Sequence, residues 1–143
     1  MKFYRNILLI TISLLFAPFA IAESVVVIVN EGNTQSLSAD DIKGIYSDNV
    51  IQWADGKAIK VYDLPVKKEA REKFSQRIMG TSARAVAKEW ANRKITNTAK
   101  NPPKTKKERL VIASVKKKAN AIGYVSESAI KGKSGIKVIM TLK

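Results

Sequence analysis

The sequence predicts an α/β domain, a sheet of strands covered by helices on both sides, and three observations lead to this fold. Apolar runs typical of strands alternate along the chain with segments whose apolar residues recur every three or four positions, as on one face of a helix. The hydrophobic share of 45% suffices for a packed core. A length of 143 residues leaves little room for a second domain. The predicted order of elements is β-α-β-α-α-α-β-β.

Four segments are predicted to form strands. Residues 24–29 read SVVVIV, a continuous β-branched run that is typical of a strand in the middle of a sheet. Residues 59–62 alternate apolar and polar side chains, and Pro65 ends this segment. Residues 121–125 read AIGYV, and the last strand, residues 136–142, follows the glycine-rich loop KGKSG.

The first three helices are predicted from caps and apolar stripes. One begins after Ser38, a hydroxyl N-cap followed by the acids Asp40 and Asp41. The next covers residues 69–79, and Gly80 stands where a helix commonly ends. Ser82 then begins the third helix.

The fourth helix follows a predicted loop over residues 92–104, which has no periodicity and contains two prolines. Thr105 with Glu108 three residues later forms the pattern of a capping box, and the helix is expected to run to about Lys118. A short helix at residues 127–129 is a further expectation.

The N-terminus has the order of a secretory signal. Lys2 and Arg5 precede an almost purely apolar stretch over residues 7–16, and the small-residue pattern Ala-Ile-Ala ends at Ala22. We expect cleavage after Ala22, which leaves residues 23–143 as the folded domain with a formal net charge of +12 instead of +14. The alternative is a retained anchor, but the stretch is shorter than the roughly 20 residues that a spanning helix needs.

Residue composition argues against catalysis. The sequence has no Cys and no His, which excludes disulfides, thiolate nucleophiles, imidazole bases and ordinary zinc sites. Asp40 and Asp41 fit a helix first turn better than an acid–base pair. The sequence lacks the glycine-rich motifs of nucleotide sites. We therefore expect no enzyme activity, no metal and no cofactor.

The basic residues concentrate in the segment 104–118, which holds seven lysines and arginines against Glu108 alone. No aromatic residue stands among them, so stacking on nucleic-acid bases is not expected. A surface that contacts anionic lipid or polysaccharide is a better interpretation, and a plain solubilising surface is better still.

An anion site is the chemistry that the residues favour most. Helix N-termini with free amides and hydroxyls hold phosphate or sulfate, and Ser36 and Ser38 precede one such terminus. Lys67, Lys68 and Arg71 cluster at the start of another, where cations oppose the helix dipole. An anion could relieve that conflict. The alternatives are a plain N-cap at Ser38 and a solvated basic patch at the lysines.

The chain from residue 23 onward resembles the substrate-binding proteins of phosphate ABC transporters, in a short single-domain form. The resemblance rests on IYSDNVIQWADG and NAIGYV, with IKVYDL, REKF and the Trp of KEW between them in the same order. It implies the fold of one lobe of a periplasmic binding protein, with a mixed sheet. In the full-length proteins two lobes close on phosphate, and these motifs belong to the second lobe.

The chain departs from the family where the ligand is held. Family members carry a Ser-Gly-Thr arm before the Arg-x-x-Phe helix, and the matching positions here are Lys67, Lys68 and Glu69. Arg71 matches the basic position of the family. The glycine-rich stretch before the fourth helix is replaced by NTAKNPPKTKK. The resemblance thus implies the fold strongly and phosphate binding weakly.

The sequence predicts a periplasmic, non-catalytic protein that binds phosphate or another small anion, accessory to phosphate uptake. The expected site residues are Ser36, Ser38, Lys67, Lys68 and Arg71. The alternative is a lobe that has lost its ligand site and binds a protein partner in the envelope. An ABC transporter component is a candidate partner, no nucleic acid is expected, and membrane contact and oligomeric state stay open.

Overall fold

The protein was analysed as a computed structural model, which describes residues 22–143. Most of the predicted signal segment, residues 1–22, therefore lies outside the described residues, and its cleavage after Ala22 stays a prediction. The strands are β1 (Val25–Asn30), β2 (Lys60–Asp63), β3 (Lys104–Thr105), β4 (Ala121–Ser126) and β5 (Ile136–Leu142). The α-helices are α1 (Ala39–Tyr46), α2 (Glu69–Phe74), α3 (Ala83–Ile95) and α4 (Glu108–Lys117).

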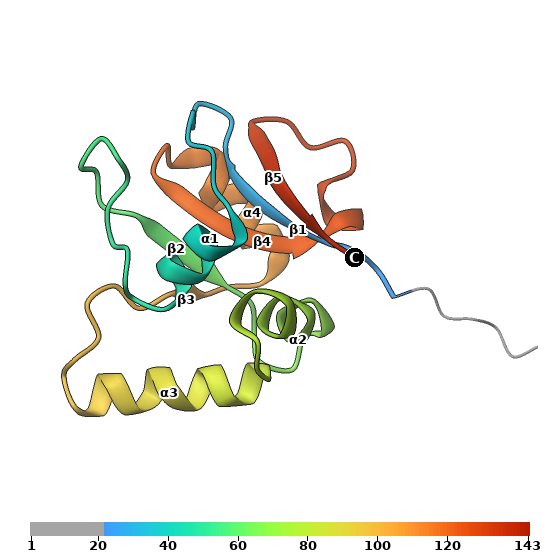
Figure 1. The fold of residues 1–143 in the computed structure, drawn as a ribbon. Coiled ribbons are helices and arrows are strands. Elements are labelled where there is room, and N and C mark those ends of the chain that lie inside the picture. Colours follow the sequence, from blue (N-terminus) through green and yellow to red (C-terminus); the bar gives the residue numbers. More distant parts are fainter. Residues whose placement is uncertain (1–21) are drawn as a thin grey trace, which may run out of the picture.

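The five strands form one mixed sheet in the order β3-β2-β4-β1-β5 (Figure 1). β1 pairs antiparallel with β4 on one side and with β5 on the other. β2 runs parallel to both β4 and β3. As the run SVVVIV predicts, β1 is an interior strand, and each side chain from Val25 to Val29 is at most 1% exposed.

Helices cover both faces of the sheet, which confirms the predicted architecture. Two neighbouring residues of β4 show this, because successive side chains of a strand point to opposite faces. Gly123 faces Val111 of α4. Tyr124 packs on the other face, where its ring lies against Phe74 of α2 and Tyr46 of α1. α4 thus forms one layer, and α1 and α2 form the other.

The predicted helix over residues 69–79 forms as α2 followed by a π-helical turn, η1 (Ser75–Met79). Gly80 ends it with a φ of 74°, the left-handed conformation that glycine adopts without penalty. α3 then lies beside this segment, away from the sheet (Figure 1). Its buried residues are Ala83, Val86 and Trp90.

The structure corrects the expectations around the fourth helix. α3 continues to Ile95, into the segment predicted to be a loop. Thr105 belongs to the short edge strand β3, and Lys107 is the N-cap of α4, so no Thr105–Glu108 capping box forms. The Glu108 carboxylate instead accepts hydrogen bonds from the backbone and hydroxyl of Ser126. Pairing with β2 overrides the local capping pattern.

The short helix expected at residues 127–129 is present as a 3-10 turn, η2 (Glu127–Ile130). The loop KGKSG separates it from β5, as predicted. Within residues 22–143, no helix combines the length and apolar character needed to cross a membrane.

Gly123 should tolerate no side chain. A Cβ at this position would lie 2.5 Å from Val111 Cγ1, so Gly123→Ala is expected to lower the free energy of unfolding by about 1–3 kcal/mol through overpacking. Urea denaturation measures the loss. Because Val111→Ala removes the clashing methyl group, the double variant should be more stable than the two single effects predict. If the losses of the two single variants add up to that of the double variant, Val111 of α4 is not the group that excludes a side chain at Gly123 of β4.

Candidate anion-binding site

A buried ion pair stands where β2 meets α2. Arg71 Nη1 of α2 lies 2.8 Å from Asp63 Oδ2 at the end of β2. The same nitrogen donates a 2.6 Å hydrogen bond to the carbonyl of Leu64. Arg71 is 4% exposed and Asp63 is 5% exposed. Nη1 of the guanidinium is therefore committed to partners within the chain.

The second carboxylate oxygen of Asp63 is also satisfied. Asp63 Oδ1 accepts a 2.9 Å bond from the Leu64 amide and a short bond from the Tyr124 hydroxyl. Burial raises the pKa of Asp63, and the charge of Arg71 with these two hydrogen bonds acts in the opposite direction. Burial, together with the Asp63 carboxylate, also raises the pKa of Tyr124. The carboxylate is thus held by three donors: Arg71 of α2, the Tyr124 hydroxyl of β4 and the amide of the next residue, Leu64.

A hollow of about 200 Å³ opens beside this ion pair. Its walls come from β2, α2, α3 and β3, which the fold brings together from distant parts of the chain. A water molecule takes about 30 Å³ in the liquid, so a small anion fits this volume. The polar and aromatic residues that line it are Asp63, Arg71, Trp90, Lys94 and Thr105.

Lys67 and Lys68 lie in the loop between β2 and α2, and both are exposed. In sequence they stand between Val66 and Arg71, which line the hollow, but neither lysine is itself a lining residue. Lys68 is the N-cap of α2, and its side chain makes no capping bond. Within residues 22–143, no ion pair includes either lysine. Their charges are therefore accessible to a solvent anion, unlike that of Arg71.

Ser38 is the N-cap of α1, which was the alternative to a role in anion binding. Its hydroxyl accepts a 3.1 Å bond from the Asp41 amide. Its own amide donates to Asp41 Oδ2 at 2.7 Å, which completes a capping box. Ser36 is exposed and lines a different hollow from Arg71. The five predicted residues thus do not converge on one hollow.

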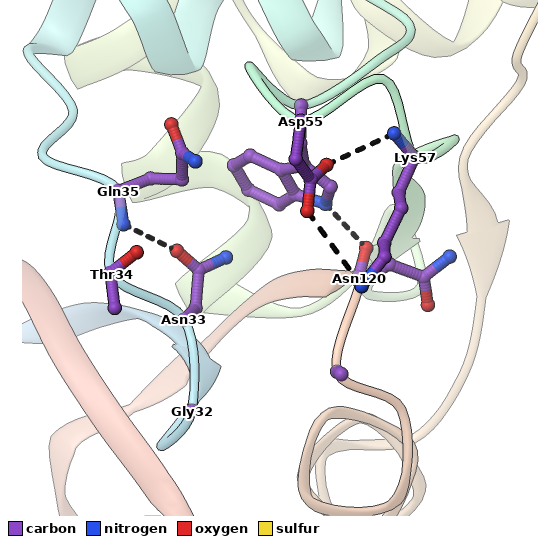
Figure 2. A pocket seen from close by; sticks show the side chains of 9 residues that line it. Gly32, Asn33, Thr34, Gln35, Asp55, Lys57 and Asn120 are labelled. Carbon is purple, nitrogen blue, oxygen red and sulfur yellow. Dashed lines mark hydrogen bonds and ion pairs between the residues drawn. The ribbon is translucent and has the colours of Figure 1, made fainter.

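A second polar hollow, of about 90 Å³, lies at the other end of β2 (Figure 2). The backbone amide of Gln35 donates to Asn33 Oδ1 at 2.8 Å, so the side-chain nitrogen of Asn33 is turned toward the hollow. Trp53 Nε1 donates to the carbonyl of Asn120 at 2.9 Å. One acid, Asp55, and one base, Lys57, stand at the rim. This balanced charge gives the second hollow no preference for anions.

Sequence reasoning did not single out Asp63. The signal available was an acid that directly follows the strand pattern IKVY, just before a proline. Spacing alone could not show that Arg71, eight residues later, would turn inward to meet it. Within the described chain, no three acids gather closely enough to hold a metal ion.

Several solved structures share this fold. One is named as a possible phosphate binding protein from Planctomyces limnophilus DSM 3776, with 14% identity and a TM-score of 0.63 over 82% of this chain and 40% of that chain. Another is an ABC-type phosphate transport receptor from Vibrio cholerae, with 16% identity, a TM-score of 0.63, and coverage of 82% and 46%.

A third is named as a phosphate ABC transporter substrate-binding protein with bound phosphate from Clostridium perfringens, at 20% identity and a TM-score of 0.62. The match covers 82% of this chain and 44% of that chain. No sequence family and no curated protein sequence matches the chain.

These likenesses define the class of fold. The chain is an α/β domain built like part of a phosphate transport receptor, which confirms the fold that the sequence resemblance implied. It spans less than half the length of each of these structures, as a single lobe would.

Arg71→Met should be strongly destabilising, because it leaves the Asp63 carboxylate buried without its cation. The expected loss is about 3–5 kcal/mol in the free energy of unfolding, measured by urea denaturation at pH 7. The exposed Lys67→Met is the control and should change stability by less than about 0.5 kcal/mol.

The same variant should show a distinctive pH dependence. Without Arg71 the folded-state pKa of Asp63 rises further above its unfolded value, so protonation favours the folded chain. The stability difference from the wild type should then shrink as the pH falls toward 4. A difference that stays constant from pH 7 to pH 4 would contradict this assignment.

Ser38→Ala should remove a cap and lower the free energy of unfolding by about 1 kcal/mol at pH 7. Hydrogen bonds from Ser38 lower the pKa of Asp41 below 3.8, so the contribution of this carboxylate is present above that pH and is lost as the pH falls through the lowered value. The difference between variant and wild type should accordingly narrow in acid. Ser36→Ala, the matched control, should stay within about 0.5 kcal/mol of the wild type throughout.

Proposed function

We propose that the protein is an exported, non-catalytic binding protein for phosphate or another small anion, accessory to phosphate uptake. The observation that carries this proposal is the shared fold: 82% of the chain superposes on three structures named for phosphate binding or phosphate transport. The resemblance of the motifs IYSDNVIQWADG and NAIGYV points to the same class of protein.

The local charges support a site at the corner between β2 and α2. Lys67 and Lys68 are exposed there and unpaired among the described residues, and Lys94 reaches the adjoining hollow. Asp63 balances the charge of Arg71, so the attraction for an anion comes from the lysines. In this arrangement Arg71 shapes the wall of the site, and Lys67 and Lys68 supply its positive charge.

A single lobe leaves one side of such a site open to water. An anion held on one side keeps much of its hydration, so affinity should be weak until another surface covers the ligand. That surface would be a protein partner in the envelope, and an ABC transporter component is the candidate that the proposed role favours. Export to the periplasm rests on the basic and apolar order of residues 1–22.

An envelope protein-interaction module is the second candidate function, and two observations favour it. Nη1 of Arg71 is already bonded to Asp63 and Leu64, and the charge of Arg71 is balanced by Asp63. Apolar side chains are also exposed near the hollow: Val66 at its wall is 40% exposed, and Ile95 at the end of α3 is 82% exposed. Capture of a stoichiometric partner from envelope extract in phosphate-free buffer would support this alternative.

Calorimetric titration with inorganic phosphate tests the first function, with sulfate as the competing anion. For protein purified after expression of the full sequence, we expect saturable phosphate binding that exceeds sulfate binding and persists at about 0.15 M salt. The double variant Lys67→Ala/Lys68→Ala should weaken phosphate binding roughly tenfold, which corresponds to a loss of about 1.4 kcal/mol in binding free energy.

The control is Lys131→Ala/Lys133→Ala, which removes the same charge from an exposed loop. It should leave phosphate affinity within about twofold of the wild type. Equal, salt-quenched binding of phosphate and sulfate, weakened alike by both double variants, would mean diffuse attraction only and would overturn the proposed site.

A further inference from the structure

On the α4 face of the sheet, two lysine side chains converge on one buried phenol. Tyr62 of β2 is 0% exposed. The Lys118 ammonium donates a 2.8 Å hydrogen bond to its hydroxyl. Lys106 Nζ lies 5.3 Å from the centre of the Tyr62 ring and 3.4 Å from the hydroxyl oxygen of Ser114. Both lysines are half-buried instead of extending into water.

The fold positions each of these groups from a different element. The Lys106 amide donates to the Asp63 carbonyl at 2.8 Å, which continues the pairing of β3 with β2. Ser114 and Lys118 are four residues apart, so they lie on the same side of α4. The Lys118 amide donates to the Ser114 carbonyl at 3.0 Å and closes the helix. The cluster is therefore fixed by the sheet edge and by the helix end.

The cluster has two positive charges and no acid to balance them. Within residues 22–143, none of the ion pairs includes Lys106 or Lys118. The Tyr62 ring attracts each ammonium group through a cation–π contact, but repulsion between the two like charges and lost side-chain freedom act against the arrangement. An anion that binds between them would offset both costs.

The Tyr62 phenol reports the same electrostatic environment. Burial alone would raise its pKa, but hydrogen bonds from Lys118 and Ser114 and the charges of both lysines lower it below the ordinary 10.0. A negatively charged oxygen is therefore favoured at this point.

We propose that Lys106 and Lys118, held in place by the hydroxyls of Ser114 and Tyr62, bind a phosphate-type oxyanion in a second site. Tetrahedral oxyanions suit it because several oxygens can accept bonds from the two ammonium groups at once. The site is separate from the corner between β2 and α2. Tyr62 and Asp63 are consecutive in β2 and point to opposite faces of the sheet. The phosphate group can be free or can belong to a lipid head group.

The test follows the backbone amide signals of the full-length chain by NMR during titration with inorganic phosphate at about 0.15 M salt. We expect saturable shifts at Ser114 and Lys118 that disappear in Lys106→Gln/Lys118→Gln. The control, Lys104→Gln/Lys117→Gln, removes the same charge from exposed neighbours and should leave the shifts intact. Tyr62→Phe should weaken binding at least threefold, because it removes the hydroxyl that holds Lys118 and keeps the ring.

A second arm measures co-sedimentation with vesicles of phosphatidylglycerol and phosphatidylcholine, against pure phosphatidylcholine. Loss of phosphate shifts in Lys106→Gln/Lys118→Gln, and not in its control, supports a site for free phosphate. Loss of vesicle binding in that variant alone supports the same site with a lipid head group. Equal behaviour of the two double variants in both arms overturns the proposal. Because the Lys67→Ala/Lys68→Ala variant leaves this cluster intact, the two proposed sites can fail independently.

Discussion

The corner of the fold that carries the candidate site depends on the buried ion pair between Asp63 and Arg71. Asp63 is the last residue of β2, and Arg71 belongs to α2. The Asp63 carboxylate also accepts hydrogen bonds from the Tyr124 hydroxyl of β4 and from the amide of Leu64. A buried charge is tolerated only when its hydrogen-bonding capacity is filled, and these donors fill it. The direction in which the chain leaves β2 and enters α2 is thereby fixed.

A cluster of three aromatic rings packs on the core side of this ion pair. The rings of Phe74 and Tyr124 stack with their centres 3.8 Å apart, and Tyr46 meets Phe74 edge-on at 4.7 Å. The Tyr46 hydroxyl donates to the carbonyl of Tyr62 at 2.8 Å, so α1 is also tied to β2. These contacts join two helices and two strands around one polar centre. The same packing closes the side of the ion pair that faces the core, and the hollow lies on its other side.

The ion pair also removes Arg71 from the positive charge that the protein presents to solvent. Arg71 is neutralised inside the fold, whereas the lysines before α2 and around α4 keep their charges at the surface. β2 separates these two groups of lysines, because Asp63 and Tyr62 point to opposite sides of the sheet. A phosphate-binding role thus has two independent places to act, one beside a hollow and one over a buried phenol. A protein partner that covers the open side of the hollow would strengthen the first site without touching the second.

Much of the fold follows from local sequence. The continuous apolar run at Val25–Val29 marks an interior strand because both of its faces must be buried, and Ser38 and Gly80 mark helix ends through their own hydrogen bonds and backbone conformation. The resemblance in the motifs around Trp53 and Gly123 then identified the lobe. The exposure of Lys67 and Lys68 beside a helix start also follows from sequence, because it is a local feature, and their role in anion binding stays a prediction.

Only the tertiary structure decided the partners of the polar side chains. Arg71 was expected among the anion-binding residues, and in the fold it meets Asp63. Glu108 was expected to cap its own helix and instead binds Ser126. Lys118 reaches Tyr62 across 56 positions of sequence. Local patterns record the periodicity and capping of single elements, which act over a few residues. Which donor meets which acceptor depends on strand order and helix placement, and those are set when the whole core closes.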